Sequence, residues 1–254
     1  MRRRIFDAHL HIIDPAFPLV PNRGYLPDPF SVDDYLREAL PLGVEGGAVV
    51  SGSFQAFDQG YLSSALKRLG AAFVGVTQLS ASAPDADIRK LDGMGVKAVR
   101  FNLRRGGSES VERLEPFARR VHDLAGWHVE LYVDSRELAE LRETLLRLPA
   151  VSIDHLGLSR EGFPTLLRLA ERGVKVKATG FGRVDFPVAD ALRAVHSANP
   201  HALMFGTDLP STRAPRPFRA GDISLLVEAL GEQAAETVLW RNAVRFYRLP
   251  EDAV

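Results

Sequence analysis

The sequence predicts an α/β fold, a single (β/α)₈ TIM barrel that spans residues 1–254. Eight short apolar runs alternate with longer stretches of helical periodicity, which is typical of repeated β-α units and a parallel sheet. The length of 254 residues suits one such barrel. No linker, low-complexity tract or change in composition divides the sequence, so we expect one domain.

The predicted strands are short runs rich in valine, isoleucine and other apolar residues. They lie at residues 5–12, 47–51, 73–79, 97–102, 128–133, 151–156, 174–179 and 203–208. Leucines and alanines three and four residues apart predict amphipathic helices between them, for example at residues 32–40, 61–69, 111–124, 136–148 and 163–172. Ser31 and Ser135 are the expected N-caps of two of these helices.

An open, doubly wound sheet produces the same alternation of strands and helices. That fold carries a G-x-G-x-x-G or P-loop glycine pattern after its first strand, and the sequence has neither there. We therefore favour the closed barrel. The proline-rich residues 14–30 then form a long first loop over the barrel mouth.

Composition narrows the choice of partner and compartment. The formal net charge is zero, which gives no reason to expect a nucleic acid or an acidic membrane surface as a partner. The absence of cysteine excludes disulfides and suits a reducing compartment, so we expect the cytoplasm. The apolar run behind the basic start is broken at Asp7, and we expect neither a signal peptide nor a membrane-spanning helix. A small molecule is the expected partner; the oligomeric state is not predicted.

Two histidines lie close together on the first predicted strand. In Asp-Ala-His-Leu-His at residues 7–11, His9 and His11 are separated by one residue, so both side chains leave the same face of the strand. They belong to its C-terminal end, where barrel enzymes keep their chemistry. The alternative is that both are structural residues satisfied by hydrogen bonds.

Two further polar residues end predicted strands. His155 follows an apolar run in Ser-Ile-Asp-His-Leu-Gly at residues 152–157, and Asp208 ends the last run in Phe-Gly-Thr-Asp-Leu-Pro at residues 205–210. A closed barrel brings strand ends to one mouth, so His155 and Asp208 are expected beside His9 and His11. Asp208 can serve there as a general base. Capping by His155 and turn formation by Asp208 are the structural alternatives.

These motifs resemble the amidohydrolase superfamily, of the amidohydrolase 2 type, whose barrel is that of metal-dependent hydrolases. Three segments are similar to the branch that contains 2-pyrone-4,6-dicarboxylate lactonase and sugar-lactone hydrolases. They are Pro-Asn-Arg-Gly-Tyr at 21–25, Gly-Val-Lys-Ala-Val-Arg-Phe-Asn at 95–102 and Gly-Trp-His-Val-Glu at 126–130. The resemblance implies catalysis by Asp208, His9, His11 and His155.

The resemblance leaves the metal open between two possibilities. Two-metal members use a carboxylated lysine on a middle strand, whereas Lys177 lies on the seventh predicted strand, so we expect no binuclear centre. The lactonase branch implies catalysis without a metal, which we favour. One divalent ion, most readily Zn²⁺, is the alternative, because His9, His11, His155 and Asp208 form a permissible tetrahedral ligand set.

Several arginines follow predicted strands and suggest a carboxylated substrate, since a guanidinium matches a carboxylate with two parallel hydrogen bonds. The resemblance assigns substrate carboxylates to arginines at about the positions of Arg100, Arg105 and Arg183, with Tyr25 from the first loop. Arg104, Arg213 and Arg216 are further candidates. Solvated loops or salt bridges are the structural alternative for each arginine.

The predicted function is a hydrolase that opens a small carboxylated lactone, as in aromatic or sugar-acid catabolism. Asp208 would activate water, and the three histidines would stabilise the oxyanion. The main alternative is a metal-dependent decarboxylase of an aromatic or unsaturated acid on the same barrel. A non-catalytic binding barrel needs no acid–base residue, so the histidine and aspartate set argues against it.

Overall fold

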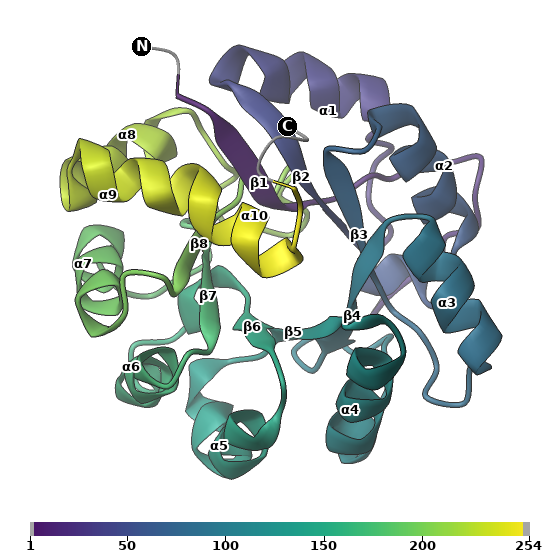
Figure 1. The fold of residues 1–254 in the computed structure, drawn as a ribbon. Helices are drawn as coiled ribbons and strands as arrows, with labels where there is room; N and C mark the ends of the chain where they lie inside the picture. The colour runs from purple at the N-terminus through teal and green to yellow at the C-terminus, as the bar shows by residue number, and fades with distance from the viewer. Residues whose placement is uncertain (1–2, 251–254) are drawn as a thin grey trace.

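Eight parallel strands form the centre of the computed structural model, which describes residues 3–250. They follow one another in the order β1 to β8 and form a ring with the helices outside it (Figure 1). The strands are β1 (Ile5–Leu10), β2 (Val44–Val50), β3 (Phe73–Thr77), β4 (Val96–Asn102), β5 (His128–Tyr132), β6 (Val151–Ile153), β7 (Lys175–Ala178) and β8 (Leu203–Phe205). All eight predicted strands and the TIM barrel are confirmed, although β6 and β8 end three residues earlier than predicted.

Helices follow the strands along the chain and cover the outside of the barrel. They are α1 (Val32–Ala39), α2 (Gly60–Leu69), α3 (Asp85–Gly93), α4 (Leu114–Ala125), α5 (Leu138–Arg147), α6 (Phe163–Glu171), α7 (Val188–Ala198), α8 (Gly221–Leu230), α9 (Glu232–Glu236) and α10 (Asn242–Tyr247). The short 3₁₀ turns are η1 (Leu40–Leu42), η2 (Ser53–Gln55), η3 (Val111–Arg113), η4 (Ser135–Glu137) and η5 (His155–Gly157), and η6 (Thr237–Arg241) is a π-helical segment. The five predicted helices are therefore all present.

One of the two predicted helix caps is correct. Ser31 caps α1 in a capping box, in which its hydroxyl accepts from the backbone N–H of Asp34 and the Asp34 carboxylate accepts from that of Ser31. The prediction for Ser135 is wrong, because the chain enters η4 one residue earlier and Asp134 is the cap. The Ser135 hydroxyl instead donates to the carbonyl oxygen of Ser159.

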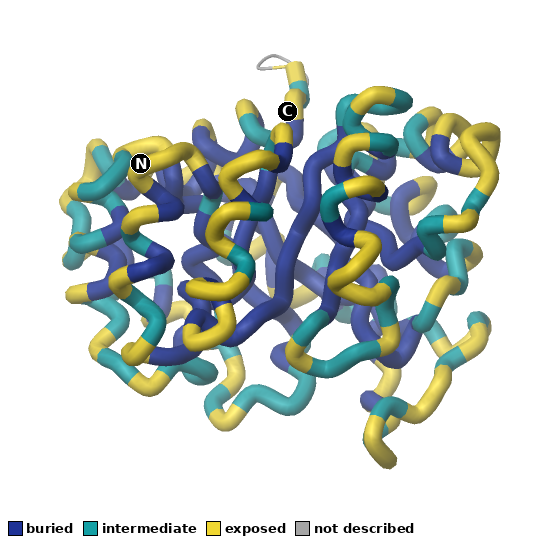
Figure 2. The backbone as a smooth tube through the Cα atoms, turned by 90° about the horizontal axis from the view of Figure 1, so that it is seen from below, coloured by how far each residue is buried: buried dark blue, intermediate teal, exposed yellow. Residues whose placement is uncertain are grey.

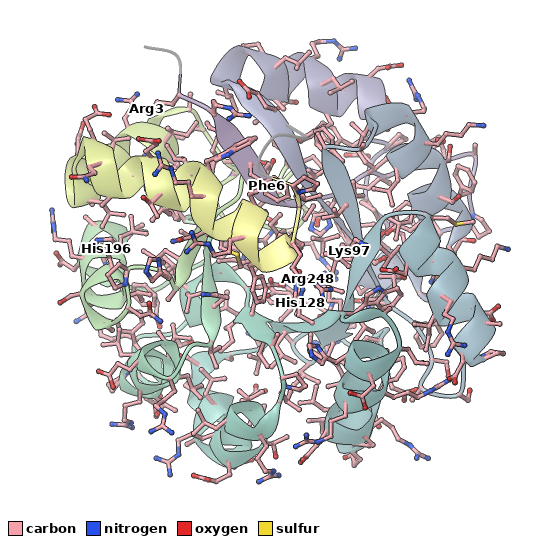
Figure 3. All side chains as sticks on the ribbon, in the orientation of Figure 1. Arg3, Phe6, Lys97, His128, His196 and Arg248 are labelled. Carbon is pink, nitrogen blue, oxygen red and sulfur yellow. The ribbon has the colours of Figure 1, made fainter. Side chains whose placement is uncertain are left out.

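The main apolar core lies between the strands and the surrounding helices. In Figure 2 the central strands are dark blue, and the helices are exposed mainly on their outer sides. A second apolar cluster joins Phe6 to Trp240 and Tyr247, so that η6 and α10 cover the end of the barrel where the strands begin. Figure 3 labels Phe6 and His128 beside α10, and the His128 ring lies 5.0 Å from that of Tyr247. No helix among residues 3–250 is long and apolar enough to cross a membrane.

The ring of strands closes where β1 meets the segment that follows β8. The backbone N–H of Asp208 donates to the carbonyl oxygen of His9 at 2.7 Å, and that of His11 donates to Leu209 at 2.8 Å. Asp7 reinforces the joint, since its carboxylate accepts from both the backbone N–H and the hydroxyl of Thr207. The closure of the barrel therefore sets the position of Asp208 relative to the two histidines.

Candidate active site

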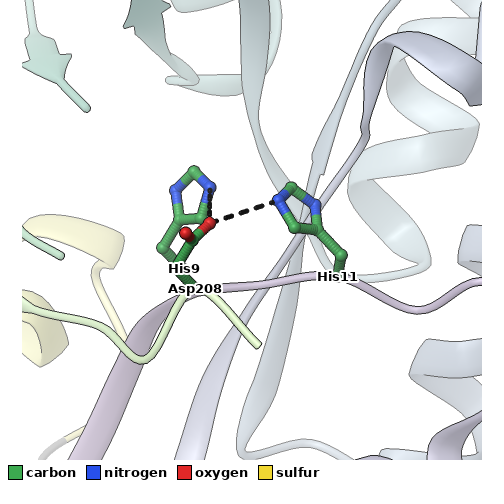
Figure 4. A group of neighbouring side chains, drawn as sticks. All are labelled: His9, His11 and Asp208. Atoms are coloured by element: carbon green, nitrogen blue, oxygen red, sulfur yellow. Dashed lines mark ion pairs between the residues drawn. The ribbon is translucent and has the colours of Figure 1, made fainter. Parts of the chain in front are cut away.

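Three histidines and one aspartate meet at the C-terminal end of the barrel. His9 lies in β1, His11 one residue beyond it, His155 two residues beyond β6 and Asp208 three residues beyond β8. The ring centroid of His9 lies 5.0 Å from that of His11 and 4.9 Å from that of His155. Figure 4 shows one carboxylate oxygen of Asp208 facing both His9 and His11. All four side chains are buried.

His155 and Asp208, which lie just beyond β6 and β8, have left-handed backbone conformations. The φ angle is 52° at His155 and 62° at Asp208, which ends the extended conformation that the sequence pattern predicted there. Such a conformation costs energy for most residues, and aspartate tolerates it better than most. Strained backbone at strand ends is a common feature of functional sites.

His11 has its ring orientation fixed by one backbone contact. Its Nδ1 lies 2.7 Å from the carbonyl oxygen of Val50, an atom that can only accept, so Nδ1 carries a proton. In the neutral ring Nε2 is then unprotonated, and it lies 3.7 Å from Oδ1 of Asp208. A neutral His11 ring therefore presents a hydrogen-bond acceptor to the pocket.

His9 lies between the site and a buried polar layer. Its Nδ1 is 3.4 Å from both Lys177 Nζ and Asp154 Oδ1, and its Nε2 is 3.9 Å from Asp208 Oδ1. Burial lowers the pKa of His9 to about 4. The negative charge of Asp154 opposes this shift, and the positive charge of Lys177 adds to it. Burial also holds the pKa of His155 well below its ordinary value. Both rings are therefore neutral at pH 7.

Asp208 is held by an arginine. The Nε of Arg183 lies 2.7 Å from Asp208 Oδ2, and Nη2 of Arg183 donates to the carbonyl oxygen of Thr212. Burial alone would raise the pKa of Asp208, but Arg183 and the neighbouring histidines lower it well below its ordinary value. The carboxylate is consequently ionised at neutral pH.

A layer of paired charges supports the site from inside the barrel. Lys177 Nζ lies 2.5 Å from Glu130 Oε2, and Arg100 Nη2 lies 2.8 Å from Asp154 Oδ2. All four side chains are buried. Nη1 of Arg100 also donates to the carbonyl oxygen of Ser51, so this predicted substrate arginine is fixed in place.

A pocket that opens to solvent lies above this layer. Its lining includes His11, Ser53, Arg100, Asn102, Arg105, Tyr132, His155, Arg183, Asp208, Thr212 and Arg213. Arg213 donates to Asn22 and Ser53, which are both neutral, and its guanidinium lies 4.6 Å from the ring centroid of Tyr25. Burial and the neighbouring Arg105 lower the pKa of Arg213. Within residues 3–250, neither Arg105 nor Arg213 forms an ion pair with a carboxylate, which leaves both guanidinium groups available to an anion.

The other predicted arginines lie elsewhere. Arg104 is exposed and does not line the pocket. Arg216 forms a two-point ion pair with Asp222 outside the pocket, so the structural alternative holds for it. The predicted first loop does reach the mouth, since Asn22 donates to the carbonyl oxygen of Arg105 and accepts from Arg213.

The site residues fit a single divalent ion. His9 Nε2 and Asp208 Oδ1 are buried and lack a hydrogen-bond partner within the described chain. Together with a ring nitrogen of His11, these atoms lie within 4.8 Å of one another. Two imidazole nitrogens and one carboxylate oxygen form a donor set that suits Zn²⁺, with further positions left for water or substrate. A second possible group shares His9 and adds Asp154 and His155.

Two residues in direct contact with the site received no role from the sequence. Asp154 was part of the motif around His155, but only the fold shows that it lies beside His9 and Arg100. Lys177 was considered only as a carboxylated metal bridge, whereas it forms ion pairs with Glu130 and Asp154. The signal available for Lys177 was its place inside a strand of the barrel, Lys175–Ala178, where a buried charge requires a partner.

A (β/α)₈ barrel with histidines and an aspartate at the C-terminal strand ends defines this protein as a barrel enzyme. The amidohydrolase family matches residues 6–249, and the chain belongs to this family of hydrolases. The resemblance inferred from the sequence motifs is thereby confirmed.

Named relatives and a solved structure agree with this assignment. The 2-pyrone-4,6-dicarboxylate hydrolase of Comamonas testosteroni is 33% identical over 156 residues, 59% of this chain and 51% of that protein. The match therefore spans about half the length of that relative. The D-galactarolactone isomerase of Agrobacterium fabrum (strain C58) is 26% identical over 272 residues, 97% of this chain and 92% of that protein. A ligand-free crystal structure from Agrobacterium tumefaciens has a TM-score of 0.87 at 24% identity, covering 98% and 97% of the two chains, which shows the shared fold.

Proposed function

We propose that this enzyme hydrolyses a small lactone that carries at least one carboxylate. One observation supports this most directly: an ionised carboxylate, Asp208, lies beside the neutral rings of His9 and His155, and the pocket also holds arginines that have no acidic partner among the described residues. The first part of this arrangement suits the activation of water beside a carbonyl group. The second suits recognition of an anionic substrate.

Asp208 is the proposed general base. It removes a proton from a water molecule as the water oxygen attacks the lactone carbonyl carbon, and the carbonyl oxygen becomes negatively charged. When the tetrahedral intermediate collapses, the bond between the carbonyl carbon and the ring oxygen breaks. Asp208 returns its proton to the ring oxygen, so water has been added across one ester bond and the base is restored.

The histidines have different roles in this scheme. His9 and His155 each have a buried ring nitrogen without a partner in the described structure, Nε2 and Nδ1 respectively, and either atom can donate to the oxyanion when protonated. Neutral His11 cannot donate through Nε2, because its proton is on Nδ1. We therefore assign His11 to holding the attacking water, which differs from the oxyanion role that the sequence suggested.

The arginines bind and orient the substrate in this proposal. Arg105 and Arg213 both line the pocket and lie close enough to affect each other's charge, and they provide two cationic groups for substrate carboxylates. Arg100, which is fixed by Asp154, and Tyr25, which packs against Arg213, complete the recognition surface. A divalent ion held by His9, His11 and Asp208 would supply Lewis-acid activation of the carbonyl group or water.

The test is turnover by purified protein whose metal content is measured before and after treatment with a chelator. The substrates are 2-pyrone-4,6-dicarboxylate and D-galactarolactone, with unsubstituted 2-pyrone as the uncarboxylated control. Hydrolysis in H₂¹⁸O should place one ¹⁸O in the ring-opened product, and Asp208→Asn should abolish the reaction. A product of unchanged mass would show isomerisation, release of CO₂ would show decarboxylation, and inertness toward all carboxylated lactones would contradict the proposal.

A further inference from the structure

Lys177 is a buried cation inside the barrel for which the proposed reaction has no use. Its side chain has no solvent exposure, and its ammonium group lies 2.5 Å from Glu130 Oε2 and 3.8 Å from Asp154 Oδ1. Glu130 also accepts hydrogen bonds from His128 and Tyr247, so its position is fixed from three sides. The ammonium group is therefore held in one place, directly beneath the candidate site.

The ammonium group contacts the ring of His9 at Nδ1. Lys177 Nζ and His9 Nδ1 are 3.4 Å apart and form a hydrogen bond. Asp154 Oδ1 lies equally close to Nδ1, but its direction from the ring is poor for a hydrogen bond, and this oxygen has no well-aligned hydrogen bond among the described residues. An ammonium group can only donate, and Nδ1 must then be the acceptor.

We propose that Lys177 is a positioning residue that keeps the proton of His9 on Nε2 and thereby makes His9 a hydrogen-bond donor to the substrate. His9 and His11 then present opposite atoms to Asp208. Nε2 of His9 carries a hydrogen, whereas Nε2 of neutral His11 carries a lone pair because its proton lies on the Val50 side. The two rings can therefore serve the oxyanion and the attacking water respectively.

The same contact opposes a metal ion at His9. A ring protonated on Nε2 has no lone pair there to offer a metal, and the fixed positive charge of Lys177 repels a second cation. A carboxylate partner at Nδ1 would have the reverse effect, as in histidine ligands whose other nitrogen donates to an acidic side chain. Lys177 and Asp154 thus favour opposite tautomers of His9, and the hydrogen-bond geometry favours Lys177.

The experiment measures the tautomer directly. Protein labelled with ¹⁵N at histidine and treated with a chelator is studied by long-range ¹H–¹⁵N correlation spectroscopy at pH 7, with His9→Asn to assign the His9 signals. We expect protonated Nε2 and unprotonated Nδ1 at His9 in the unmodified protein. A proton on Nδ1 of His9 would overturn the inference without any need for a further variant.

A pair of variants tests the part played by Lys177. Lys177→Met alone would leave a buried carboxylate at Glu130 without its cation, so the test variant is Lys177→Met combined with Glu130→Gln, and Glu130→Gln alone is the control. In the double variant we expect the His9 proton to move to Nδ1, toward Asp154, and the dissociation constant for Zn²⁺ to fall at least tenfold. An unchanged His9 tautomer or unchanged zinc affinity in a double variant that retains its circular dichroism would contradict the inference.

The inference rests on the proposed function in one respect only, namely that the hydrogen on Nε2 of His9 serves the oxyanion of a lactone substrate. The tautomer and the zinc affinity are measured without a lactone, so their outcome does not depend on turnover. If no carboxylated lactone is turned over and His9 has the expected tautomer, the proposed function is contradicted and the role of Lys177 is not. If a carboxylated lactone is turned over and His9 has the opposite tautomer, the role of Lys177 is contradicted and the proposed function is not.

Discussion

Arg183 and Asp208 form an ion pair inside the candidate pocket, with Arg183 Nε 2.7 Å from Asp208 Oδ2. The same arginine lines the pocket that is proposed to receive a carboxylated substrate. Arg183 is therefore already engaged by the proposed base, whereas the sequence suggested an arginine for the substrate only. The pairing keeps Asp208 ionised and leaves Oδ1 facing the histidines.

Replacing Arg183 with glutamine should shift the pH dependence of the reaction. Without the guanidinium, burial raises the pKa of Asp208, so the base becomes protonated and inactive at a higher pH than in the unmodified enzyme. We expect the acidic limb of kcat/KM to move upward in pH, and kcat/KM at pH 6 to fall about a hundredfold. A pH–rate profile measures this, with Arg193→Gln on the exposed face of α7 as the control. An acidic limb at the original pH would show that Arg183 does not set the protonation of Asp208.

Substitution of the unpaired arginines should weaken substrate binding more than catalysis. Arg105→Gln and Arg213→Gln each remove one charge-assisted hydrogen bond to a carboxylate, a loss of about 1.5–3 kcal/mol. We expect KM for a carboxylated lactone to rise about ten- to a hundredfold, with little change in kcat. Arg104→Gln is the matched control, because Arg104 is the exposed neighbour of Arg105. Equal KM values for Arg104→Gln and the two test variants would contradict the assigned roles.

The sequence predicted the barrel well because the strands are apolar runs of the right length and spacing. It placed the ends of β6 and β8 too late, since His155 and Asp208 adopt left-handed conformations that no apolar pattern reveals. His9, His11, His155 and Asp208 were expected together because strand ends in a closed barrel converge. The Arg183–Asp208 pair could not be predicted, because it depends on the conformations of two loops.

Lys177 shows a different limit of sequence analysis. A lysine in a short strand is usually expected at the surface, since an unpaired charge is costly to bury. Here Glu130, from another strand, supplies the opposite charge, and the pairing becomes visible only when the barrel closes. The sequence thus identified the residues that face the pocket better than the buried charged residues beneath the pocket, such as Lys177 and Glu130.

Gly206 should be required for the close approach of β8 to β1. A Cβ atom at this position would lie 2.7 Å from the backbone nitrogen of His9 and 2.9 Å from its Cβ, so the two segments would have to separate. We expect Gly206→Ala to lower the free energy of unfolding by about 1–3 kcal/mol and to lower kcat at least tenfold. Urea denaturation and turnover measure the two effects.

Gly93→Ala is the control for that substitution. Gly93 ends α3, has no positive φ angle and has open space where its Cβ would lie. Its replacement should change stability by less than about 1 kcal/mol and leave kcat unchanged. Equal effects of the two alanine substitutions would show that close packing at Gly206 is not what positions Asp208.

Asp7 should make the stability of the fold depend on pH between about 4 and 6. Burial raises its pKa from 3.8 to about 6, although hydrogen bonds from Thr207, His9 and Tyr35 lower it in part. In this range the folded state holds a proton at Asp7 that the unfolded chain has already released. The free energy of unfolding must therefore fall as the pH rises through the range, and the ionised carboxylate costs the folded state about 3 kcal/mol above pH 6.

Asp7→Asn isolates this contribution, because asparagine keeps one oxygen for the backbone N–H groups of His9 and Thr207 and cannot ionise. Its amide group can donate to the Tyr35 and Thr207 hydroxyls, which can turn to accept. The variant should gain stability relative to the unmodified protein as the pH rises from 4 to 6, and the difference should be constant above pH 7. Denaturation by urea at half-unit pH intervals measures the difference. A stability difference that does not vary with pH would mean that the Asp7 carboxyl group titrates alike in the folded and unfolded states, and its hydrogen bonds to Thr207 would then offset its burial in full.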